Sequence, residues 1–363
     1  MQKLLNKISS QTKSDFITYG IVIAAFVIIQ ILGAVGLLSS SFSGLLVPIC
    51  AYVVMAVSLN LTVGILGELS LGHAGFMSIG AFSGVVAAAM METGVGSPLL
   101  RLILAMVVGG IIAGIAGFVI GIPVLRLRGD YLAIVTLAFG EIIKNIINCI
   151  YVGLDDAGLH FAMAGLGDVQ GAESLGLQSG GRVILNGPVG AVGVQKLSTF
   201  TIGFILVMLT LVVVLNIKRS RTGRAIMAVR DNRIAAESVG ISITRYKMTA
   251  FIISAVLAGM AGVLFAMNYT SIIASKFNID MSILVLVFVV LGGMGNIRGS
   301  IIATVVLYML PEMLRGLDNL RMLIYAVVLI AVMLFTNSDK AKQFREKLRF
   351  KWEESRNKGG KAA

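Results

Sequence analysis

Charged residues are scarce in this chain. Only 13% of its 363 residues are Asp, Glu, Lys or Arg, whereas soluble domains carry about 25%. Hydrophobic residues make up 57%, and the mean hydropathy is +0.93. This balance excludes an ordinary soluble domain and indicates a polytopic membrane protein.

Cysteine and histidine are also scarce. Cys50 and Cys149 both fall inside apolar runs, which favours small buried hydrophobes over a disulfide or a metal pair. The two histidines, His73 and His160, belong to no Cys/His cluster. The sequence therefore predicts no metal site, and we expect no cofactor.

A phosphate-binding loop is missing, since the pattern G-x-x-x-x-G-K-[ST] does not occur. The stretch Gly293-Met-Gly295 lacks the spacing of a dinucleotide fingerprint, and no βαβ unit surrounds it. Catalysis inside a bilayer would need paired groups, and the only candidates are Glu141 with Lys144, and His73. We therefore expect a protein that is not an enzyme and that takes its energy from a partner.

Long apolar runs alternate with loops along the chain. A helix needs about 20 apolar residues to cross a bilayer, so the runs predict an all-α integral membrane protein of about ten spans. The predicted transmembrane domain covers residues 1–336, and a basic tail covers residues 337–363. The predicted spans lie near residues 16–38, 44–66, 72–91, 99–124, 131–152, 199–217, 248–267, 281–296, 299–315 and 321–336.

Lysine and arginine mark one side of the predicted protein. The N-terminal segment, the link Arg126–Arg128, the loop Lys218–Lys247 and the tail are basic, and ten spans place them together. Cytoplasmic loops carry an excess of these residues, so both termini are predicted to be cytoplasmic. The net charge of +12 does not indicate nucleic-acid binding, because the basic loops would face an anionic lipid leaflet.

The loop at residues 153–198 falls on the opposite, outer side. It is glycine-rich and poor in hydrophobic periodicity. It either caps the outer face, contacts an external partner, or is a solvated excursion. Its acidic residues are Asp155, Asp156, Asp168 and Glu173.

The basic loop Lys218–Lys247 is too patterned to serve only as a topology signal. Ile226, Val229 and Ile234 recur among its charges, as on a short amphipathic helix, and Gly240 offers a helix stop. A membrane protein that displays structured helix to the cytosol offers a surface on which a partner can act.

Polar residues interrupt one predicted span. Glu141, Lys144, Asn145 and Asn148 fall at i, i+3, i+4 and i+7, hence on one helix face. A lone charge there costs about 2.5–3.5 kcal/mol on insertion scales, so this face turns to protein or water rather than to lipid. It either holds an internal ion pair or lines a substrate path. His73, between glycines, is either a satisfied histidine at a helix entry or a gating residue.

Two glycine-rich breaks, Gly72–Gly75 and Gly292–Gly295, lie at the inner ends of predicted spans. Interrupted segments at matching positions in two halves of a chain point to a transport site. Plain close packing of helices through small residues explains the glycines equally well. The candidate path residues are Gly72, His73, Gly75, Glu141, Asn145, Gly292, Gly293 and Gly295.

Four stretches, in their order, resemble the permeases of branched-chain amino acid ABC importers of the LivM type. They are SLNLTVG at 58–64 with LSLGHAGFMSIGA at 69–81, GDYLAIVTLAF at 129–139, GRAIMAVRDNRIAAESVG at 223–240, and VLGGMGNIRG at 290–299. The resemblance covers residues 45–335, and it implies a multi-pass protein of the bacterial inner membrane that transports branched-chain or related hydrophobic amino acids. Similar chains are assigned to urea and short amides.

The resemblance also implies partners. They are a second, related permease subunit that completes a heterodimer, two cytoplasmic ABC ATPases and a periplasmic substrate-binding protein. Residues 223–241 match the segment that docks the ATPase, with Arg224, Arg230, Asp231, Arg233, Glu237 and Gly240 as docking residues.

Two other classes of protein stay open on the residues alone. A secondary transporter would run on ion coupling, which the intramembrane Glu141 could support. A membrane scaffold would use the basic loop only as a binding surface. ATP-dependent uptake by a reconstituted complex separates all three.

Overall fold

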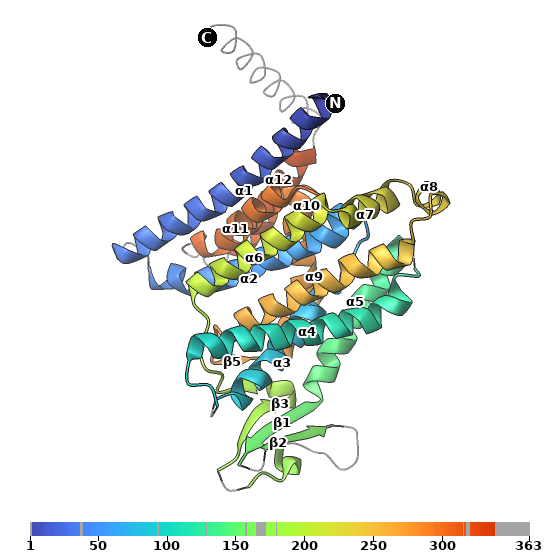
Figure 1. The fold of residues 1–363 in the computed structure, drawn as a ribbon. Coiled ribbons are helices and arrows are strands. Elements are labelled where there is room, and N and C mark those ends of the chain that lie inside the picture. Colours follow the sequence, from blue (N-terminus) through green and yellow to red (C-terminus); the bar gives the residue numbers. More distant parts are fainter. Residues whose placement is uncertain are drawn as a thin grey trace. The chain divides into compact units, whose positions relative to one another are not determined.

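The computed structural model describes residues 2–36, 39–92, 94–127, 129–156, 158–164, 172–178, 180–314, 316 and 320–337 (Figure 1). The chain forms two compact units, residues 1–305 and residues 306–363. The first unit holds helices α1 to α10, the start of α11 and a β-sheet, and the second holds the rest of α11 and α12. The predicted basic tail from residue 338 onward, Arg128 and Asp168 lie outside the described residues.

Seven helices in the described part of the chain are long and apolar enough to cross a membrane, and they coincide with seven of the predicted spans. Helices α5 (Asp130–Asn148), α11 (Ile297–Met313) and α12 (Arg321–Asn337) also form at predicted spans but are not among the seven, so ten spans stay a prediction. The seven apolar stretches lie in α1 (Gln2–Ala34), α2 (Ser40–Asn60) with the π-helical turn η1 (Leu61–Leu66), α3 (His73–Met90), α4 (Pro98–Val124), α6 (Phe200–Arg219), α9 (Ile243–Ala266) and α10 (Ile279–Gly292).

Helix α9 forms the core of the first unit and packs along α2, α3 and α4. Glycines make these contacts close. A Cβ atom on Gly80 of α3 would lie 2.1 Å from the carbonyl oxygen of Gly259 in α9. A Cβ atom on Gly259 would in turn lie 2.8 Å from the carbonyl oxygen of Gly109 in α4. Three helices therefore meet backbone to backbone, as small residues allow in membrane proteins.

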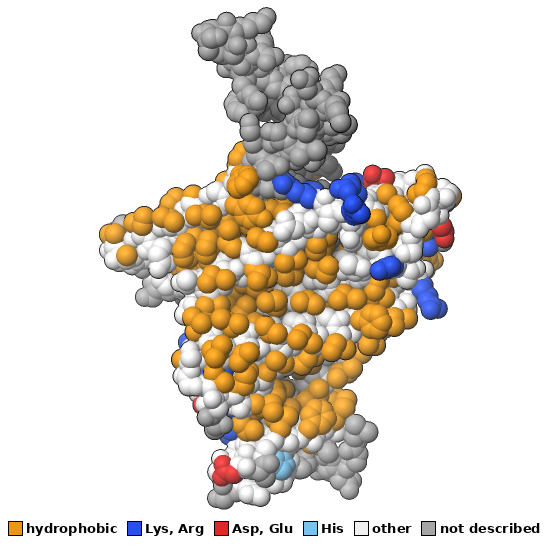
Figure 2. All heavy atoms as spheres, viewed as in Figure 1, with side chains coloured by type: hydrophobic (Ala, Val, Ile, Leu, Met, Phe, Trp, Pro, Cys, Tyr) orange, Lys and Arg blue, Asp and Glu red, His pale blue; other side chains and the backbone are white. Residues whose placement is uncertain are grey.

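The sides of the helices are apolar. Ile28 of α1, Ile115 of α4 and Ile205 of α6 are among many large hydrophobic side chains that stay exposed. In the view of Figure 2, orange hydrophobic side chains cover the helices, and charged side chains appear mainly near α7 and α8 and near the sheet. An exposed apolar surface of this extent is expected where lipid, rather than water, is the solvent.

The prediction of an all-α fold is wrong for the 153–198 loop. Much of this loop forms an antiparallel five-stranded sheet in the order β2-β1-β3-β4-β5, and its last strand follows α9. The strands are β1 (Ile150–Asp155), β2 (Gly158–Met163), β3 (Arg182–Asn186), β4 (Ala191–Val192) and β5 (Ser271–Ile272), with 3₁₀ turns η2 (Ala172–Leu175) and η3 (Gly187–Val189) between them.

The first hairpin of the sheet has a local cause. The Asp155 carboxylate accepts a hydrogen bond from the Gly158 N–H at 3.1 Å and lies 3.0 Å from His160 Nε2. Gly158 takes φ +130°, which favours glycine. A bulge between Val152 and Gly153 interrupts the alternation of β1, so strand periodicity is hard to recognise in the sequence. Because β1 begins at Ile150, the predicted span 131–152 is also too long at its end.

The interruption predicted between the eighth and ninth spans is confirmed. Helix α10 ends at Gly292 and α11 begins at Ile297. The α10 helix has 14 residues, so it rises about 21 Å and is shorter than the ~30 Å hydrocarbon core. With the preceding 3₁₀ turn η4 (Ala274–Lys276), the apolar stretch reaches 19 residues. Gly293 and Gly295 make the break with φ values of +94° and +78°.

The sidedness of the protein is a prediction that cysteine labelling tests. Gln178, in the loop of the sheet, and Ser238, at the end of α8, are both exposed. In a Cys149→Ser background, Gln178→Cys is expected to react with an impermeant maleimide on intact cells. Ser238→Cys is expected to react only after permeabilisation, because the basic loop stays inside. Labelling of Ser238→Cys on intact cells would reject the predicted orientation.

Candidate functional site

The basic loop folds into two short helices, α7 (Arg221–Asp231) and α8 (Arg233–Ser238). Each begins at a polar N-cap, as helix entries favour. The Ser220 hydroxyl accepts a hydrogen bond from the Gly223 N–H at 3.1 Å, and the Asn232 side chain accepts one from the Ala235 N–H at 3.0 Å. The second cap explains why the loop is not one continuous helix.

This break at Asn232 divides the apolar residues of the loop between two faces. Ile226 and Val229 of α7 are buried against the membrane helices, as their spacing predicts. The prediction that Ile234 shares their face is wrong: its side chain is 82% exposed, and that of Val239 is 74% exposed. The restart of the helix at residue 233 turns Ile234 away from the protein, so α8 presents apolar side chains outward.

The C-terminal end of α7 is attached to the π-helical turn that ends the second span. Arg230 donates from its guanidinium to the carbonyl oxygen of Gly64 at 3.0 Å, in the π-helical turn η1. A helix end has carbonyl groups without intrahelical partners, and a cation there is favourable. Gly67, in the left-handed region at φ +81°, leaves room for the Arg230 side chain, whose Cγ would lie 2.5 Å from a Cβ atom at that position.

The break between α10 and α11 meets the same turn. The Gly295 N–H donates to Asn60 Oδ1 at 2.8 Å, and Asn60 Nδ2 donates to the Ser300 hydroxyl at 2.7 Å. Lys218, at the end of α6, donates to the Gly295 carbonyl oxygen at 3.0 Å. A Cβ atom on Gly64 would lie only 2.2 Å from the Gly295 nitrogen.

We call this meeting point the inner junction, after the side on which the basic loop is predicted to lie. It joins the second span, the α10–α11 break and the base of the basic loop, and it consists of Asn60, Gly64, Lys218, Arg230, Gly295 and Ser300. Of these, only Arg230 and Gly295 are candidates from the sequence. The sequence could have indicated Asn60, because it is a single amide side chain in an apolar span and a polar group inside the bilayer needs a hydrogen-bond partner.

The glycines of the α10–α11 break have different roles. A Cβ atom on Gly292 would lie 2.3 Å from the Ser300 nitrogen, so this position requires glycine for packing. Gly293 has open space, since the nearest atom to its Cβ position is Asn296 Cβ at 3.6 Å, and glycine there serves its positive φ. Close packing and backbone bending therefore both operate within one break.

The glycines at the start of α3 pack against α5. A Cβ atom on Gly72 would lie 2.1 Å from the carbonyl oxygen of Thr136, and one on Gly75 would lie 3.0 Å from Gly140 Cα. His73 between them is buried, with its Nε2 2.8 Å from the Ser58 hydroxyl. His73 therefore has a hydrogen-bond partner in α2, which favours the interpretation as a satisfied histidine at a helix entry.

The polar face of α5 is divided. Glu141 and Lys144 form an ion pair whose side chains are partly exposed. Glu141 and Gly75 line a narrow crevice beside Asn278 at the start of α10, with no room for a water molecule. Asn145 lies on the exposed surface. The structure therefore brings Glu141, but not Asn145, toward the start of α3.

Comparison with known proteins follows the same segments. Residues 41–335 match the family model described as "Branched-chain amino acid transport system / permease component". The chain belongs to this family. It is 33% identical over 309 residues to the high-affinity branched-chain amino acid transport system permease protein LivM of Salmonella typhimurium and of Escherichia coli. These alignments cover 83% of this chain and 70% of each relative.

One less similar relative of this permease carries a different name. The permease is 28% identical over 260 residues to the L-arabinose ABC transporter permease protein AraH of Azospirillum brasilense, which covers 71% of this chain and 66% of the relative. No solved structure gave a significant match. The resemblance inferred from the four sequence stretches is confirmed, and all four lie within the matched residues.

The permease does not gather all candidate path residues in one place. The α3 start reaches α10 near its beginning, where the Ala74 N–H donates to the Ser282 hydroxyl at 3.1 Å. The second break lies at the other end of α10, after Gly292. From Ser282 to Gly292 the helix rises roughly 15 Å. The two glycine breaks therefore lie along one short helix, at separate depths.

Proposed function

We propose that this permease is the membrane-spanning subunit of an ATP-driven importer that passes branched-chain or related hydrophobic amino acids inward across the bacterial inner membrane. The family and the printed names of the LivM relatives support this substrate class. The lack of a phosphate-binding loop supports dependence on separate ATPases. The proposed complex also contains a second, related permease subunit and a periplasmic binding protein.

The observation that carries the proposal is the attachment of α7 to the inner junction. Arg230 and Lys218 hold carbonyl oxygens of two interrupted segments, at Gly64 and Gly295. On the other side of the loop, α8 exposes Ile234 and Val239 beside the charges of Arg233 and Glu237. An ATPase that binds α7 and α8 and moves on nucleotide hydrolysis would therefore displace the end of the second span and the α10–α11 break through these contacts.

Broken helices suit the passage of a zwitterion. Backbone N–H and C=O groups freed at a break can replace hydration without a charged side chain, and non-helical backbone is tolerated only where it is buried or lines a cavity. In the proposal, Gly72, Gly75, Gly292, Gly293 and Gly295 lie beside the path. His73 and Glu141 lie next to it, and Asn145 is peripheral.

One observation bears on the ion-coupled alternative. Glu141 is partly buried within α5, as a coupling carboxylate would be, but Lys144 neutralises it in the same helix turn. Urea or short amides remain alternative cargo for an ATP-driven permease. Uptake assays with leucine, arabinose, urea and acetamide, each with ATP or with an ionophore, discriminate among these classes.

Reversing the charge of Arg230 tests the coupling route. In a reconstituted complex, Arg230→Glu is expected to lower ATP-dependent leucine uptake at least about tenfold, because a charged hydrogen bond is worth about 1.5–3 kcal/mol. ATP hydrolysis is expected to continue, because the outer face of α8 is unchanged. Uptake and hydrolysis are measured in the same proteoliposomes.

Arg221→Glu is the matched control, since Arg221 is an exposed cation of the same helix. It should leave uptake within a small factor of wild type. Equal uptake by Arg230→Glu and Arg221→Glu would reject the coupling route. Uptake that persists without ATP and stops with an ionophore would reject the importer itself.

A further inference from the structure

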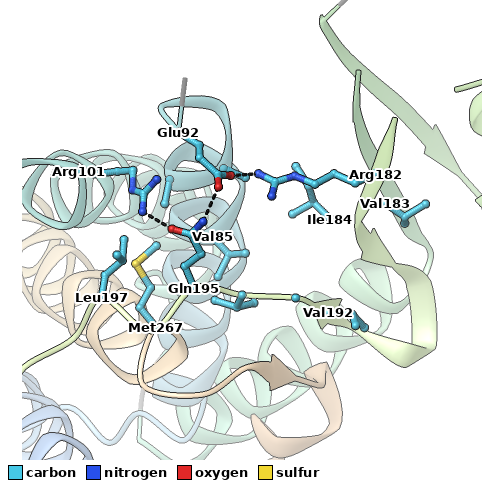
Figure 3. A pocket seen from close by; sticks show the side chains of 14 residues that line it. Val85, Glu92, Arg101, Arg182, Val183, Ile184, Val192, Gln195, Leu197 and Met267 are labelled. Atoms are coloured by element: carbon cyan, nitrogen blue, oxygen red, sulfur yellow. Dashed lines mark hydrogen bonds and ion pairs between the residues drawn. The ribbon is translucent and has the colours of Figure 1, made fainter. Parts of the chain in front are cut away.

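A cavity of about 300 Å³ opens beside the sheet of the first unit (Figure 3). Figure 1 shows that the sheet lies at the end of this unit away from α7 and α8. It lies between the end of α3, the start of α4, strand β3 and the segment that leads from β4 into α6. Its volume is at the lower end of the range for small-molecule sites, about 300–1,000 Å³. None of the candidate residues from the sequence lines it.

A row of polar side chains crosses this cavity. Arg101 of α4 donates to the amide oxygen of Gln195, Gln195 donates to the carboxylate of Glu92, and Arg182 of β3 pairs with the same carboxylate (Figure 3). The row therefore holds two cations and one anion, and only Arg182 contacts that anion directly. Arg101, the more buried of the two cations, is separated from Glu92 by the neutral amide of Gln195.

Arg101 has hydrogen-bonding capacity to spare. Arg101 is only 7% exposed, and its buried Nε has no hydrogen-bond partner among the described residues. Its contact with Gln195 satisfies one terminal nitrogen but brings no negative charge. A buried cation without an anion is costly, and a guanidinium presents a fork of donors that matches a carboxylate.

The rest of the cavity wall is apolar. Val85 of α3, Leu197 before α6 and Met267 after α9 face the row of polar groups (Figure 3). An aliphatic chain of a few carbons would contact this wall while a charged head group meets Arg101 and Glu92. The site thus offers a cation, an anion and an apolar surface within one small volume.

We infer that this cavity binds an α-amino acid with an aliphatic side chain as its zwitterion. The carboxylate binds the Arg101 guanidinium in place of Gln195, the ammonium binds Glu92, and the aliphatic chain packs on Val85, Leu197 and Met267. This assignment rests on the proposed function and deepens it, because it places an entry site for the cargo at the end of the permease opposite the α7–α8 loop.

Direct binding tests the assignment on the full complex in nanodiscs, without binding protein and with radiolabelled leucine as the probe. Valine and isoleucine should compete. Leucinol, which lacks the carboxylate, and 4-methylpentanoate, which lacks the ammonium group, should each compete at least about tenfold more weakly. These comparisons use the wild-type protein, so they do not depend on whether a variant folds.

Variants then locate the site. Arg101→Gln and Glu92→Gln should each weaken leucine binding about tenfold or more, and Leu197→Trp should block it by filling the cavity. Lys196→Gln is the control, because Lys196 is an exposed cation next to Gln195 that does not line the cavity. Wild-type affinity in Arg101→Gln, or equal competition by leucinol and leucine, would overturn the assignment.

The two proposals fail in different assays. A wild-type complex that takes up leucine with ATP and binding protein, yet binds no leucine by itself, would overturn the cavity assignment and leave the importer intact. A complex that binds leucine at Arg101 but takes up none would overturn the importer and keep the site. A complex that neither binds leucine nor takes it up with ATP and binding protein would reject both proposals.

Discussion

Gly64→Val is expected to abolish uptake and to reduce sharply the yield of folded permease. Even the Cβ atom of the new side chain would lie 2.2 Å from the Gly295 nitrogen, 2.8 Å from Gly295 Cα and 1.8 Å from Asn60 Oδ1. The Gly295 backbone, held in the α10–α11 break, cannot give way as the end of a flexible side chain can. The clash would separate the π-helical turn from the α10–α11 break and remove the Asn60 hydrogen bonds with it.

The expected loss is large for a single substitution. Overpacking alone costs about 1–3 kcal/mol, and a buried amide left without its partners adds about 1–3 kcal/mol. Fluorescence-detected size-exclusion chromatography measures the folded yield, and proteoliposome uptake measures transport. Gly64→Ala should show the same defect in milder form.

Gly44→Val is the matched control for this prediction. Gly44 lies in the same α2 helix, but a Cβ atom there would meet nothing within 4 Å. Wild-type yield and uptake in Gly64→Val would disprove the close approach at the inner junction. A folded Gly64→Val complex that hydrolyses ATP but does not transport would instead assign the turn to the path.

Glu68→Gln is expected to destabilise the permease by about 3 kcal/mol, the lower end of the cost of breaking a buried ion pair. Lys247, in the first turns of α9, is only 3% exposed and pairs with Glu68 in the segment that leads to α3. Removal of the carboxylate leaves a buried ammonium group without its counterion. The partial exposure of Glu68 lets water reach the pair, which keeps the cost at the lower end.

A double substitution separates the charge effect from the loss of the pair. Glu68→Gln with Lys247→Met should restore most of the thermal stability in detergent, because a buried methionine of similar volume needs no counterion. Asp231→Asn provides the exposed comparison, since its partner pair with Arg230 lies at the surface and should change stability by at most about 1 kcal/mol. Equal unfolding temperatures for Glu68→Gln and Asp231→Asn would contradict this account.

Lys247 and Arg230 together tie the basic loop to the start of the third span. Arg230 binds the turn at Gly64, and Lys247 binds Glu68, four residues further along the chain. The end of the second span and the segment that follows it are thus each held by one cation of the basic loop. A force applied to α7 and α8 reaches this segment through charged contacts rather than through a flexible linker.

Several features were predictable because they depend on local pattern. The apolar runs predicted the seven membrane-type helices, and the glycines at 292–295 predicted the break between α10 and α11. The burial of Ile226 and Val229 followed from helical spacing. Each of these features depends only on residues that are close together in the sequence, so the length of a run or the spacing of its residues is enough to predict it.

Other features were missed because a competing local or distant contact decided them. The Asn232 cap restarts the helix and turns Ile234 outward, against the periodicity of the loop. The sheet forms from short strands with a bulge, and its fifth strand comes from beyond α9, so no single stretch of sequence shows it. Asn145 falls on the same helical face as Glu141 but remains on the surface, because α3 covers only part of that face.

By itself, the sequence determined that this chain is a multi-span permease of the branched-chain amino acid family, since run length, charge distribution and motif order are properties of the linear chain. Only the tertiary structure decided which groups meet. Arg230 and Gly64 are 166 positions apart, Gly295 and Asn60 are 235 apart, and Arg101 and Gln195 are 94 apart. Contacts over such separations arise from how whole helices pack, and no local pattern encodes them.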